Sequence, residues 1–405
     1  MRASFRASPS HYKKGSPLSR IWPHRYLSKD EGSNPLMPFS EFLGNTRTVA
    51  ALRGMLATER MPHAMLFAGP RGVGKFTLAR MFAQAANCER LTDDFCGECS
   101  PCRAIARLQD TPTLIEQGLG ERGESADSAT VERVPLVLET HPDVWAIVPD
   151  PVRLKNPVAR PILHVGQLRA VQRAAYFKPV TKRRVFIIEG AETMRWDHAN
   201  IFLKILEEPP ETATLVLLAP NPYLLLPTIR SRCLQFSFSP LAPDQVEQVL
   251  RRRDDLTPAQ RKVAAQLAEG SPGLALAVDL AEAAELRKTA LRVLTAIIER
   301  RSSTELFSET ARLTKAQKMP FETILEVFYS LLNDLLELSA GFADHGVRNP
   351  ALGRELAKLS RQVDAAWIAT AVDGLDELGG RLRRNVNRQL GLDAIALSLS
   401  EALQK

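Results

Sequence analysis

The 405-residue sequence lacks any apolar run close to the roughly 18 residues that a membrane-spanning helix needs. Its N-terminal region has no apolar segment of the kind that directs secretion. Cysteine is scarce as well: the chain has five, and four of them fall between residues 88 and 102. An odd number with such tight clustering argues against the disulfide framework of a secreted protein. These absences predict a cytoplasmic protein that makes no membrane contact.

The overall composition is that of a globular protein, since 45% of the residues are hydrophobic and 24% are charged. A chain of this length has room for two or three domains. Lys and Arg number 53 against 46 Asp and Glu, which gives a net charge of +7. This excess permits a polyanionic partner such as DNA, and it is equally compatible with an ordinary basic protein.

Residues 1–36 carry Arg, Lys, Ser, Pro and His with almost no acidic residues and little periodicity. Such a composition is typical of a disordered segment. An Arg- and Ser-rich start with few acidic residues also resembles an organellar transit peptide. The interpretation that we favour is a start codon assigned too early, with Met37 as the true first residue.

Short apolar strands alternate with amphipathic helices from Met37 to about residue 240. Strands are predicted in HAMLFAGP, HPDVWAIVPD, RRVFIIEG and ATLVLLAP. The alternation predicts an α/β domain with a parallel sheet over residues 37–240, with a surface insertion at 111–140. After Pro240 the strand signal disappears, and the remaining segments have helical spacing.

The segment GPRGVGK lies between a predicted strand and a predicted helix. Backbone amides of such a loop, and of the helix after it, bind phosphate, and the lysine adds a positive charge. The candidate nucleotide-binding residues are Gly69, Gly72, Gly74 and Lys75. The next residue is Phe76, where a Ser or Thr hydroxyl normally binds Mg²⁺. The loop is a poor metal site, and whether it binds nucleotide or serves only as scaffold stays open.

The strand RRVFIIEG ends in Glu189 and Gly190. Proteins that hydrolyse nucleotide usually end this strand in an aspartate that holds Mg²⁺ and a glutamate that orients water. Gly190 cannot orient water, and the longer side chain of Glu189 changes the metal geometry. Together with Phe76, these departures predict that the chain binds ATP and Mg²⁺ weakly or not at all, and that it does not hydrolyse ATP efficiently.

The four clustered cysteines are Cys88, Cys96, Cys99 and Cys102. Their two adjacent C-x2-C steps form tight turns suited to the tetrahedral thiolate coordination of Zn²⁺, and Cys88 completes the set of four ligands. Because the set has no histidine and no open position, we predict a structural zinc site. Free thiols and an iron–sulfur cluster are the alternatives.

The segment LLLPTIRSRCLQF places Arg230 and Arg232 at a short helical turn near the end of the sheet. An arginine there can reach a nucleotide bound by a neighbouring subunit. A finger of this kind accelerates phosphoryl transfer by roughly 10³- to 10⁵-fold. The alternative is a charge that contacts only solvent. For the basic run at 182–184, contact with DNA and exposure to solvent both stay open.

Four segments together resemble the clamp-loader subunits of bacterial DNA polymerase III, which are AAA+ proteins. They are HAMLFAGPRGVGK, the cysteine cluster, NIFLKILEEPP and TIRSRC, and they extend the similarity over residues 37–280. The C-terminal RRNVNRQLGLDAI also resembles the end of the collar domain in these subunits. The resemblance implies an AAA+ P-loop domain (37–240) with a zinc module (88–102), a small helical lid (241–281) and an all-α collar for oligomerisation (282–405).

Within this family, the gamma/tau subunit hydrolyses ATP, and the delta-prime subunit has lost the residues for hydrolysis to varying degrees. Here Gly273 stands where a lid arginine is expected, in addition to the changes at Phe76 and Gly190. The Ser-Arg-Cys motif at 231–233 is intact. The resemblance therefore implies a delta-prime-type subunit that supplies Arg232 in trans to the ATP site of a neighbouring gamma/tau subunit.

The partners implied are the gamma/tau and delta subunits of a heteropentamer. Through that complex the chain would act on the beta sliding clamp and on primer-template DNA, contacted at its backbone phosphates. Two other functions stay open. A gamma/tau-type ATPase would show Mg²⁺-dependent turnover in isolation, and a stand-alone zinc-bearing DNA-binding module would not associate with clamp-loader subunits.

Overall fold

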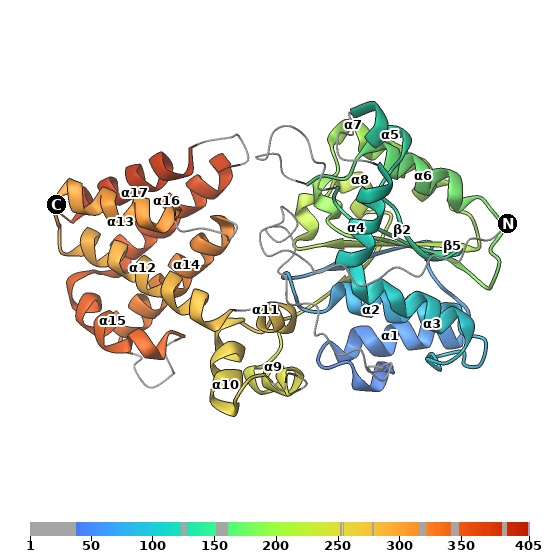
Figure 1. The fold of residues 1–405 in the computed structure, drawn as a ribbon, viewed down its shortest axis with the longest axis horizontal. Helices are drawn as coiled ribbons and strands as arrows, with labels where there is room; N and C mark the ends of the chain where they lie inside the picture. The colour runs from blue at the N-terminus through green and yellow to red at the C-terminus, as the bar shows by residue number, and fades with distance from the viewer. Residues whose placement is uncertain are drawn as a thin grey trace. The chain divides into compact units, whose positions relative to one another are not determined.

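The computed structural model describes residues 38–122, 128–150, 161–251, 253, 255–277, 279–315, 321–341, 348–382 and 387–403. The predicted extension at 1–36 lies outside these residues. The chain divides into two compact units, Met1–Ala277 and Val278–Lys405 (Figure 1). Among the described helices, none combines the length and the apolar character that crossing a membrane requires.

The first unit is built around a six-stranded sheet with the order β2-β3-β4-β5-β1-β6. The strands are β1 (Ala64–Ala68), β2 (Leu138–His141), β3 (Val144–Ile147), β4 (Arg184–Ile188), β5 (Ala213–Ala219) and β6 (Leu234–Ser237). Neighbouring strands are parallel except for β2 and β3. The prediction of an α/β fold is confirmed. The prediction of a parallel sheet was wrong for one pair of strands, because β2 and β3 are antiparallel. Only residues 142 and 143 separate β2 from β3, which is too short for a parallel crossover.

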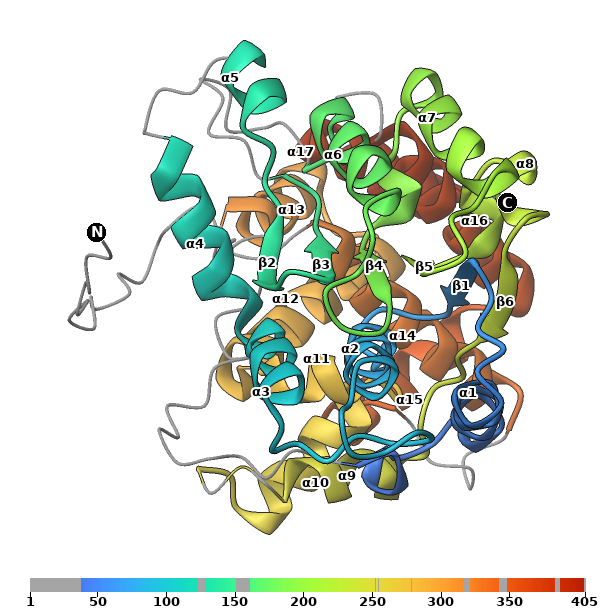
Figure 2. The same cartoon turned by 90° about the vertical axis from the view of Figure 1, so that its right-hand side faces the viewer.

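Helices cover both faces of the sheet (Figure 2), and every residue of β1, β4 and β5 is buried. Parallel strands with two covered faces consist of continuous apolar residues, as predicted for these segments. One face packs against α1 (Thr46–Ala57), α2 (Lys75–Ala86) and α3 (Ser100–Ala106). The other packs against α6 (Val165–Ala175) and α7 (Trp196–Glu207).

The described part of residues 111–140 contributes to the core. It forms α4 (Thr111–Arg122), α5 (Ser128–Arg133) and part of β2. Ile115 and Leu119, one helical turn apart, are buried in the same core as α2. Arg122 pairs with Asp150 at 2.6 Å, and their side chains are only 2% and 0% exposed. The prediction of a surface insertion was wrong because the apolar face of α4 is narrow and lies in a polar, Gly-containing sequence.

Four short helices complete the first unit: α8 (Pro227–Arg230), α9 (Pro243–Leu250), α10 (Pro258–Leu267) and α11 (Pro272–Ala277). Each begins with proline, whose fixed φ suits the first helical position and whose missing N–H is not needed there. Thr257 caps α10 by accepting a hydrogen bond from the amide of Gln260. The helical prediction for this region is confirmed, and its separation as a lid domain stays a prediction.

The second unit is helical throughout its described residues, as predicted. Its helices are α12 (Leu280–Ile298), α13 (Ser303–Lys315), α14 (Phe321–Ser339), α15 (Gly353–Leu359), α16 (Ala365–Leu382) and α17 (Arg388–Ala402). Asp279 and Asn387 cap α12 and α17 with their side-chain oxygens. One apolar core, with Phe328, Leu331 and Trp367 among its members, joins the helices.

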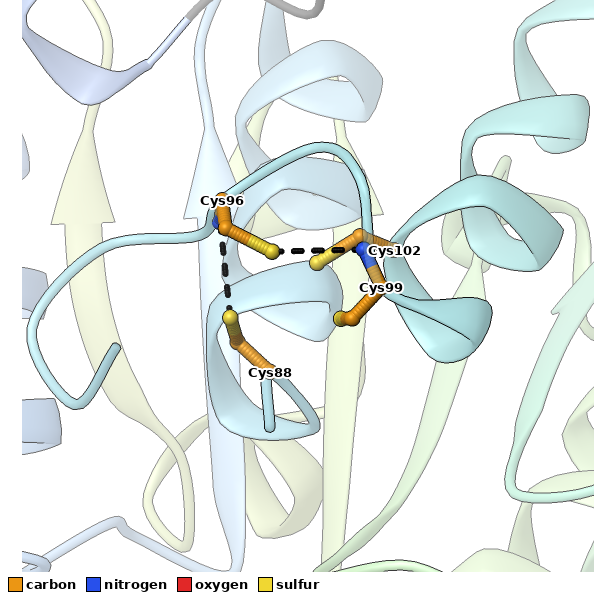
Figure 3. A group of neighbouring side chains, drawn as sticks. All are labelled: Cys88, Cys96, Cys99 and Cys102. Carbon is orange, nitrogen blue, oxygen red and sulfur yellow. Dashed lines mark hydrogen bonds between the residues drawn. The ribbon is translucent and has the colours of Figure 1, made fainter. Parts of the chain in front are cut away.

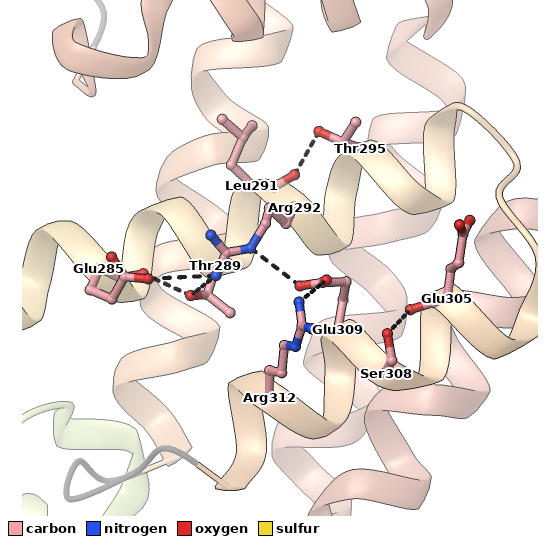
Figure 4. Close-up of polar contacts among 9 residues, drawn as sticks. All are labelled: Glu285, Thr289, Leu291, Arg292, Thr295, Glu305, Ser308, Glu309 and Arg312. Atoms are coloured by element: carbon pink, nitrogen blue, oxygen red, sulfur yellow. Dashed lines mark hydrogen bonds and ion pairs between the residues drawn. The ribbon is translucent and has the colours of Figure 1, made fainter.

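A polar network on the surface of this unit joins α12 to α13 (Figure 4). Arg292 lies 3.5 Å from Glu285 and 3.2 Å from Glu309, and Arg312 lies 2.7 Å from Glu309. Exposed ion pairs contribute about 0–1 kcal/mol each. The apolar core is therefore the main source of stability in this unit, and the network mainly favours one pairing of the two helices.

Candidate functional site

The four clustered cysteines converge on one point at the end of α2 (Figure 3). Cys88 follows the helix, Cys96 lies in the next loop, Cys99 directly precedes α3, and Cys102 lies in the first turn of α3. Their four sulfur atoms lie within 4.8 Å of one another. Cys96 is partly exposed and the other three are buried. The structure thus brings together all four residues that the sequence singled out.

The surroundings of the sulfurs suit thiolate ligands. Backbone amides of Leu91 and Cys96 donate to Cys88 Sγ at 3.4 Å, and the amide of Cys99 donates to Cys96 Sγ at 3.3 Å. Burial raises the pKa of Cys96, but hydrogen bonds from the backbone of Cys99 and Glu98 outweigh it and bring the pKa to about 7. Burial raises the pKa of Cys102 well above its ordinary value.

A bound cation reverses such a rise, because it stabilises the deprotonated thiol. Four sulfur donors with no nitrogen or oxygen among them match a tetrahedral zinc-type site. The cluster can therefore hold a metal ion such as zinc, with Cys88, Cys96, Cys99 and Cys102 as its ligands.

The glycine-rich loop lies between β1 and α2, where the sequence predicted it. Gly69, Gly72 and Gly74 all have positive φ. At Gly69 a Cβ atom would lie 2.3 Å from the carbonyl oxygen of Phe238, so that only glycine fits. The last glycine, Gly74, directly precedes the first residue of α2.

The lysine of this loop is bonded to the loop itself. Lys75 Nζ donates to the carbonyl oxygens of Gly69 at 2.5 Å and Pro70 at 2.6 Å. The residue is 9% exposed, and this burial lowers the pKa of Lys75 to about 8, against the opposing attraction of Glu189 and Glu192. Backbone carbonyls therefore hold the ammonium group that would otherwise contact phosphate.

Glu189 and Glu192 lie close to this lysine. Burial raises the pKa of Glu189 to about 7, although the nearby charge of Lys75 acts in the opposite direction. Burial raises the pKa of Glu192 as well, and its carboxylate lies 4.0 Å from the guanidinium of Arg71. Glu192 was missed in the sequence, where an acidic residue shortly after the strand end was the only signal.

The two positions that lack metal- and water-binding side chains are occupied by structurally integrated residues. Phe76, the second residue of α2, is partly buried and packs against the apolar core. Gly190 has a left-handed φ of +64°, and a Cβ atom there would lie 2.6 Å from Pro149 Cγ. The backbone at Gly190 therefore opposes any side chain, including the carboxylate that hydrolysis needs.

Helix α11 lies directly against the loop. The amide of Gly273 donates to the carbonyl oxygen of Gly72 at 2.8 Å. A Cβ atom on Gly72 would lie 3.0 Å from the amide nitrogen of Leu274. Gly273, the residue found where the lid arginine is expected, is thus a backbone contact of the loop.

Arg232 lies in the turn between α8 and β6. It donates to the carbonyl oxygen of Thr228 at 3.0 Å and to Glu207 Oε1 at 2.9 Å, and the side chains of this ion pair are 37% and 53% exposed. The guanidinium of Arg230 instead lies 4.7 Å from the ring centre of Tyr223. These contacts make Arg232 an accessible, oriented cation, and its partner Glu207 was not predicted.

Comparison with known proteins adds a family to this geometry. The family model described as "DNA polymerase III, delta subunit" matches residues 44–242. The delta-prime subunit of DNA polymerase III from Bacillus subtilis is 25% identical over 366 residues, which cover 88% of this chain and 96% of that protein. The chain is therefore similar to DNA polymerase III clamp-loader subunits over most of its length.

Other relatives share a smaller part of their length. The tau/gamma subunit of DNA polymerase III from Haemophilus influenzae is 32% identical over 214 residues, which cover 52% of this chain and 25% of that protein. The gamma/tau subunit of DNA polymerase III from Mycobacterium tuberculosis is 30% identical, and the alignment covers 53% of this chain and 31% of that protein. Among solved structures, the match to a DNA polymerase III gamma subunit-related protein from Thermotoga maritima covers 88% of this chain and 99% of that protein. The sequence identity is 16% and the TM-score is 0.36.

Proposed function

We propose that this chain is a delta-prime-type clamp-loader subunit, which supplies Arg232 to the ATP site of an adjacent gamma/tau subunit and hydrolyses little ATP itself. One contrast carries the proposal. The metal and water positions beside the chain's own loop are taken by Phe76 and Gly190, while Arg232 is exposed. An alignment that is 25% identical and covers 96% of a delta-prime subunit supports the same assignment.

The geometry of Arg232 suits a residue that acts in trans. Its planar guanidinium can bind two phosphate oxygens at once. An exposed ion pair is worth about 0–1 kcal/mol, so Arg232 can exchange Glu207 for a phosphate at little cost. The contact with Thr228 fixes the side chain near its own turn. A cation oriented in this way stabilises the charge that develops during phosphoryl transfer.

The residues around Lys75 do not fit a Mg²⁺–ATP site that performs hydrolysis. No hydroxyl follows Lys75, because the next residue is the apolar Phe76. The strand end offers a single carboxylate, Glu189, whose raised pKa of about 7 weakens it as a ligand near neutral pH. We assign this region a scaffold role, in which the loop and α11 form one packed unit.

The proposed partners are the gamma/tau and delta subunits in a heteropentamer. Through them the chain takes part in placing the beta sliding clamp on primer-template DNA, with DNA contacts to backbone phosphates. The proposed metal is a structural zinc ion at the cysteine cluster. This role needs a stable fold and one exposed arginine, and both are compatible with the loss of turnover in the chain itself.

The test is a reconstituted clamp loader assembled with wild-type chain, Arg232→Ala or Arg230→Ala. Arg230 is a matched control because it lies two residues away and stacks on Tyr223. We expect Arg232→Ala to lower hydrolysis at the adjacent site by roughly 10³-fold, and clamp loading to fall with it. Arg230→Ala should retain wild-type rates. Equal rates for the two variants would exclude the finger.

The alternative of a gamma/tau-type ATPase is tested on the purified chain alone. We expect no Mg²⁺-dependent hydrolysis above the level of a Lys75→Met variant. Substantial turnover that disappears in Lys75→Met would replace the proposal with the ATPase. Failure to assemble with gamma/tau and delta subunits would instead favour a stand-alone zinc-bearing DNA-binding module.

A further inference from the structure

The turn that leads into β4, residues 180–184 with the first residue of the strand included, is held by two buried side chains from distant parts of the chain. One of them is Asp143, in the turn between β2 and β3, which is 1% exposed. Its carboxylate accepts the amides of Val180 at 2.9 Å and Thr181 at 2.6 Å, and the Thr181 hydroxyl lies 2.7 Å away. Asp143 therefore fixes the first half of the turn.

The second buried side chain is Asn87, which follows the last residue of α2 and is fully buried. Its Oδ1 accepts the amides of Lys182 at 3.3 Å and Arg183 at 3.0 Å, and the hydroxyl of Thr181 lies 2.7 Å from it. Its Nδ2 donates to the carbonyl oxygen of Ala83 at 3.1 Å. Asn87 therefore fixes the second half of the turn and is itself fixed by α2.

Asn87 is the residue before Cys88, and a further bond joins the turn to that cysteine. Lys182 Nζ donates to the carbonyl oxygen of Cys88, 94 residues away in sequence. On the other side of the cluster, Gln84 Nε2 donates to the carbonyl oxygen of Cys102 at 3.0 Å. The backbone at 87 and 88 is thus shared between the cysteine cluster and the 180–184 turn.

We propose that metal binding at the cysteine cluster sets the conformation of the 180–184 turn through Asn87 and the Cys88 carbonyl. A metal–sulfur bond fixes Cys88 in place. It thereby fixes the preceding residue, Asn87, whose Oδ1 accepts the amides of Lys182 and Arg183. The turn adjoins an exposed apolar surface that includes Phe177, 64% exposed, and Val180, 73% exposed. The metal ion then sets the conformation of the chain beneath this surface as well as that of the loop that binds the ion.

The coupling has a direction that can be measured amide by amide. Hydrogen exchange followed by NMR on the full-length chain compares the zinc-loaded and the metal-stripped protein. We expect the amides of Lys182 and Arg183, which bond to Asn87, to lose protection on stripping. The amides of Val180 and Thr181, which bond to Asp143, should change much less. Asn87→Ala in the zinc-loaded protein should reproduce the loss at Lys182 and Arg183.

Coupling between two sites is reciprocal, so that weakening the turn must also weaken metal binding. We expect Asn87→Ala to lower the zinc affinity about 10-fold, measured by competition with a chromogenic chelator. This is the lower end of the loss that is typical when a residue that orients a metal ligand is replaced. Lys182→Met, which removes the hydrogen bond from Nζ to the carbonyl oxygen of Cys88, should act in the same direction with a smaller effect. Asn221→Ala is the matched control, because Asn221 caps an exposed turn elsewhere.

Three results would overturn the proposal. The first is equal protection of Lys182 and Arg183 with and without zinc. The second is wild-type zinc affinity in both Asn87→Ala and Lys182→Met. The third is loss of protection throughout β1 and β5 on stripping, which would make the metal a determinant of the whole sheet and not of the turn.

Discussion

The two ends of α2 carry sites of opposite completeness. At its N-terminus, the loop keeps its glycines and Lys75 but lacks the hydroxyl and the second carboxylate that hydrolysis needs. At its C-terminus, the cysteine cluster keeps all four donor atoms within 4.8 Å of one another. One helix therefore joins a loop that lacks two groups needed for hydrolysis to a cluster that can hold a metal ion. The fold of a nucleotide loop does not by itself imply nucleotide chemistry.

Electrostatics separates the two ends further. Near Lys75, burial disfavours the charged forms of Lys75 and Glu189, and each is only partly compensated by the other. Near the cysteines, burial also opposes ionisation of Cys102, but a bound cation would reverse that effect. Burial at the loop end shifts the pKa values of Lys75 and Glu189 toward their neutral forms. At the cysteine end, burial excludes water from a cluster that can hold a metal ion.

The largest expected effect is at the cysteine end. Cys99→Ser should abolish stoichiometric zinc binding and unfold the segment 88–102, because structural zinc contributes roughly 10–16 kcal/mol in zinc-finger peptides. Cys233→Ser is the matched control, since Cys233 is a buried cysteine outside the cluster. Metal analysis and limited proteolysis provide the readouts. Full zinc content in Cys99→Ser would contradict the assignment of the four ligands.

The next effect tests whether the loop end can be repaired. Phe76→Thr combined with Gly190→Glu restores two of the side chains that hydrolysis needs, the hydroxyl at 76 and the carboxylate at 190, yet we expect no ATPase activity and a loss of a few kcal/mol in stability. A left-handed φ costs a residue other than glycine roughly 1–2 kcal/mol. The new Cβ at position 190 would also lie 2.6 Å from Pro149. Recovery of Mg²⁺-dependent turnover would show that only the side chains had been missing.

A smaller effect concerns the pH dependence of stability at the loop end. The folded pKa of Glu189 is about 7, above its ordinary value of 4.5, so that the native state binds more protons than the unfolded state between these pH values. The free energy of unfolding therefore falls as pH rises from about 5 to 7. The pKa of Lys75 is lowered to about 8 from 10.5, so stability from this group rises again between those values.

Glu189→Gln should remove the contribution of this carboxylate to the slope between pH 5 and 7, a difference of about 1–3 kcal/mol at 1.36 kcal/mol per pKa unit. Urea unfolding at pH 5, 6 and 7 measures it. Glu211→Gln, at an exposed position, serves as the control and should keep the wild-type slope. An unchanged slope in Glu189→Gln would mean that the carboxylate is ionised without penalty in the folded chain.

The smallest expected effect is on the folding of Arg232→Ala. Its exposed ion pair with Glu207 contributes about 0–1 kcal/mol, so thermal unfolding should shift by only a few degrees. This separates a functional arginine from a structural one. A large drop in the unfolding temperature would attribute the loss of clamp loading to misfolding, and Arg232→Lys would then distinguish charge from geometry.

The sequence predicted the buried elements better than the edges. The central strands were found because they are continuous apolar runs. Strand β6 was missed, because only Phe236 of its four residues is buried and the remainder has no apolar pattern. The apolar residues of α4 escaped notice for the same reason, since two buried apolar positions in a helix of 12 residues give a weak periodic signal.

The sequence alone determined the composition of each site, because a donor set is a property of residue types. Four cysteines at metal-ligand spacing, and the absence of a hydroxyl at 76 and of a carboxylate at 190, are visible without any structure. Only the tertiary structure decided which groups meet. Asn87 receives the amides of residues 182 and 183, and Lys75 lies within the electrostatic influence of Glu189, because the parallel sheet places distant segments side by side. Such contacts depend on the path of the chain in space, which residue spacing does not encode.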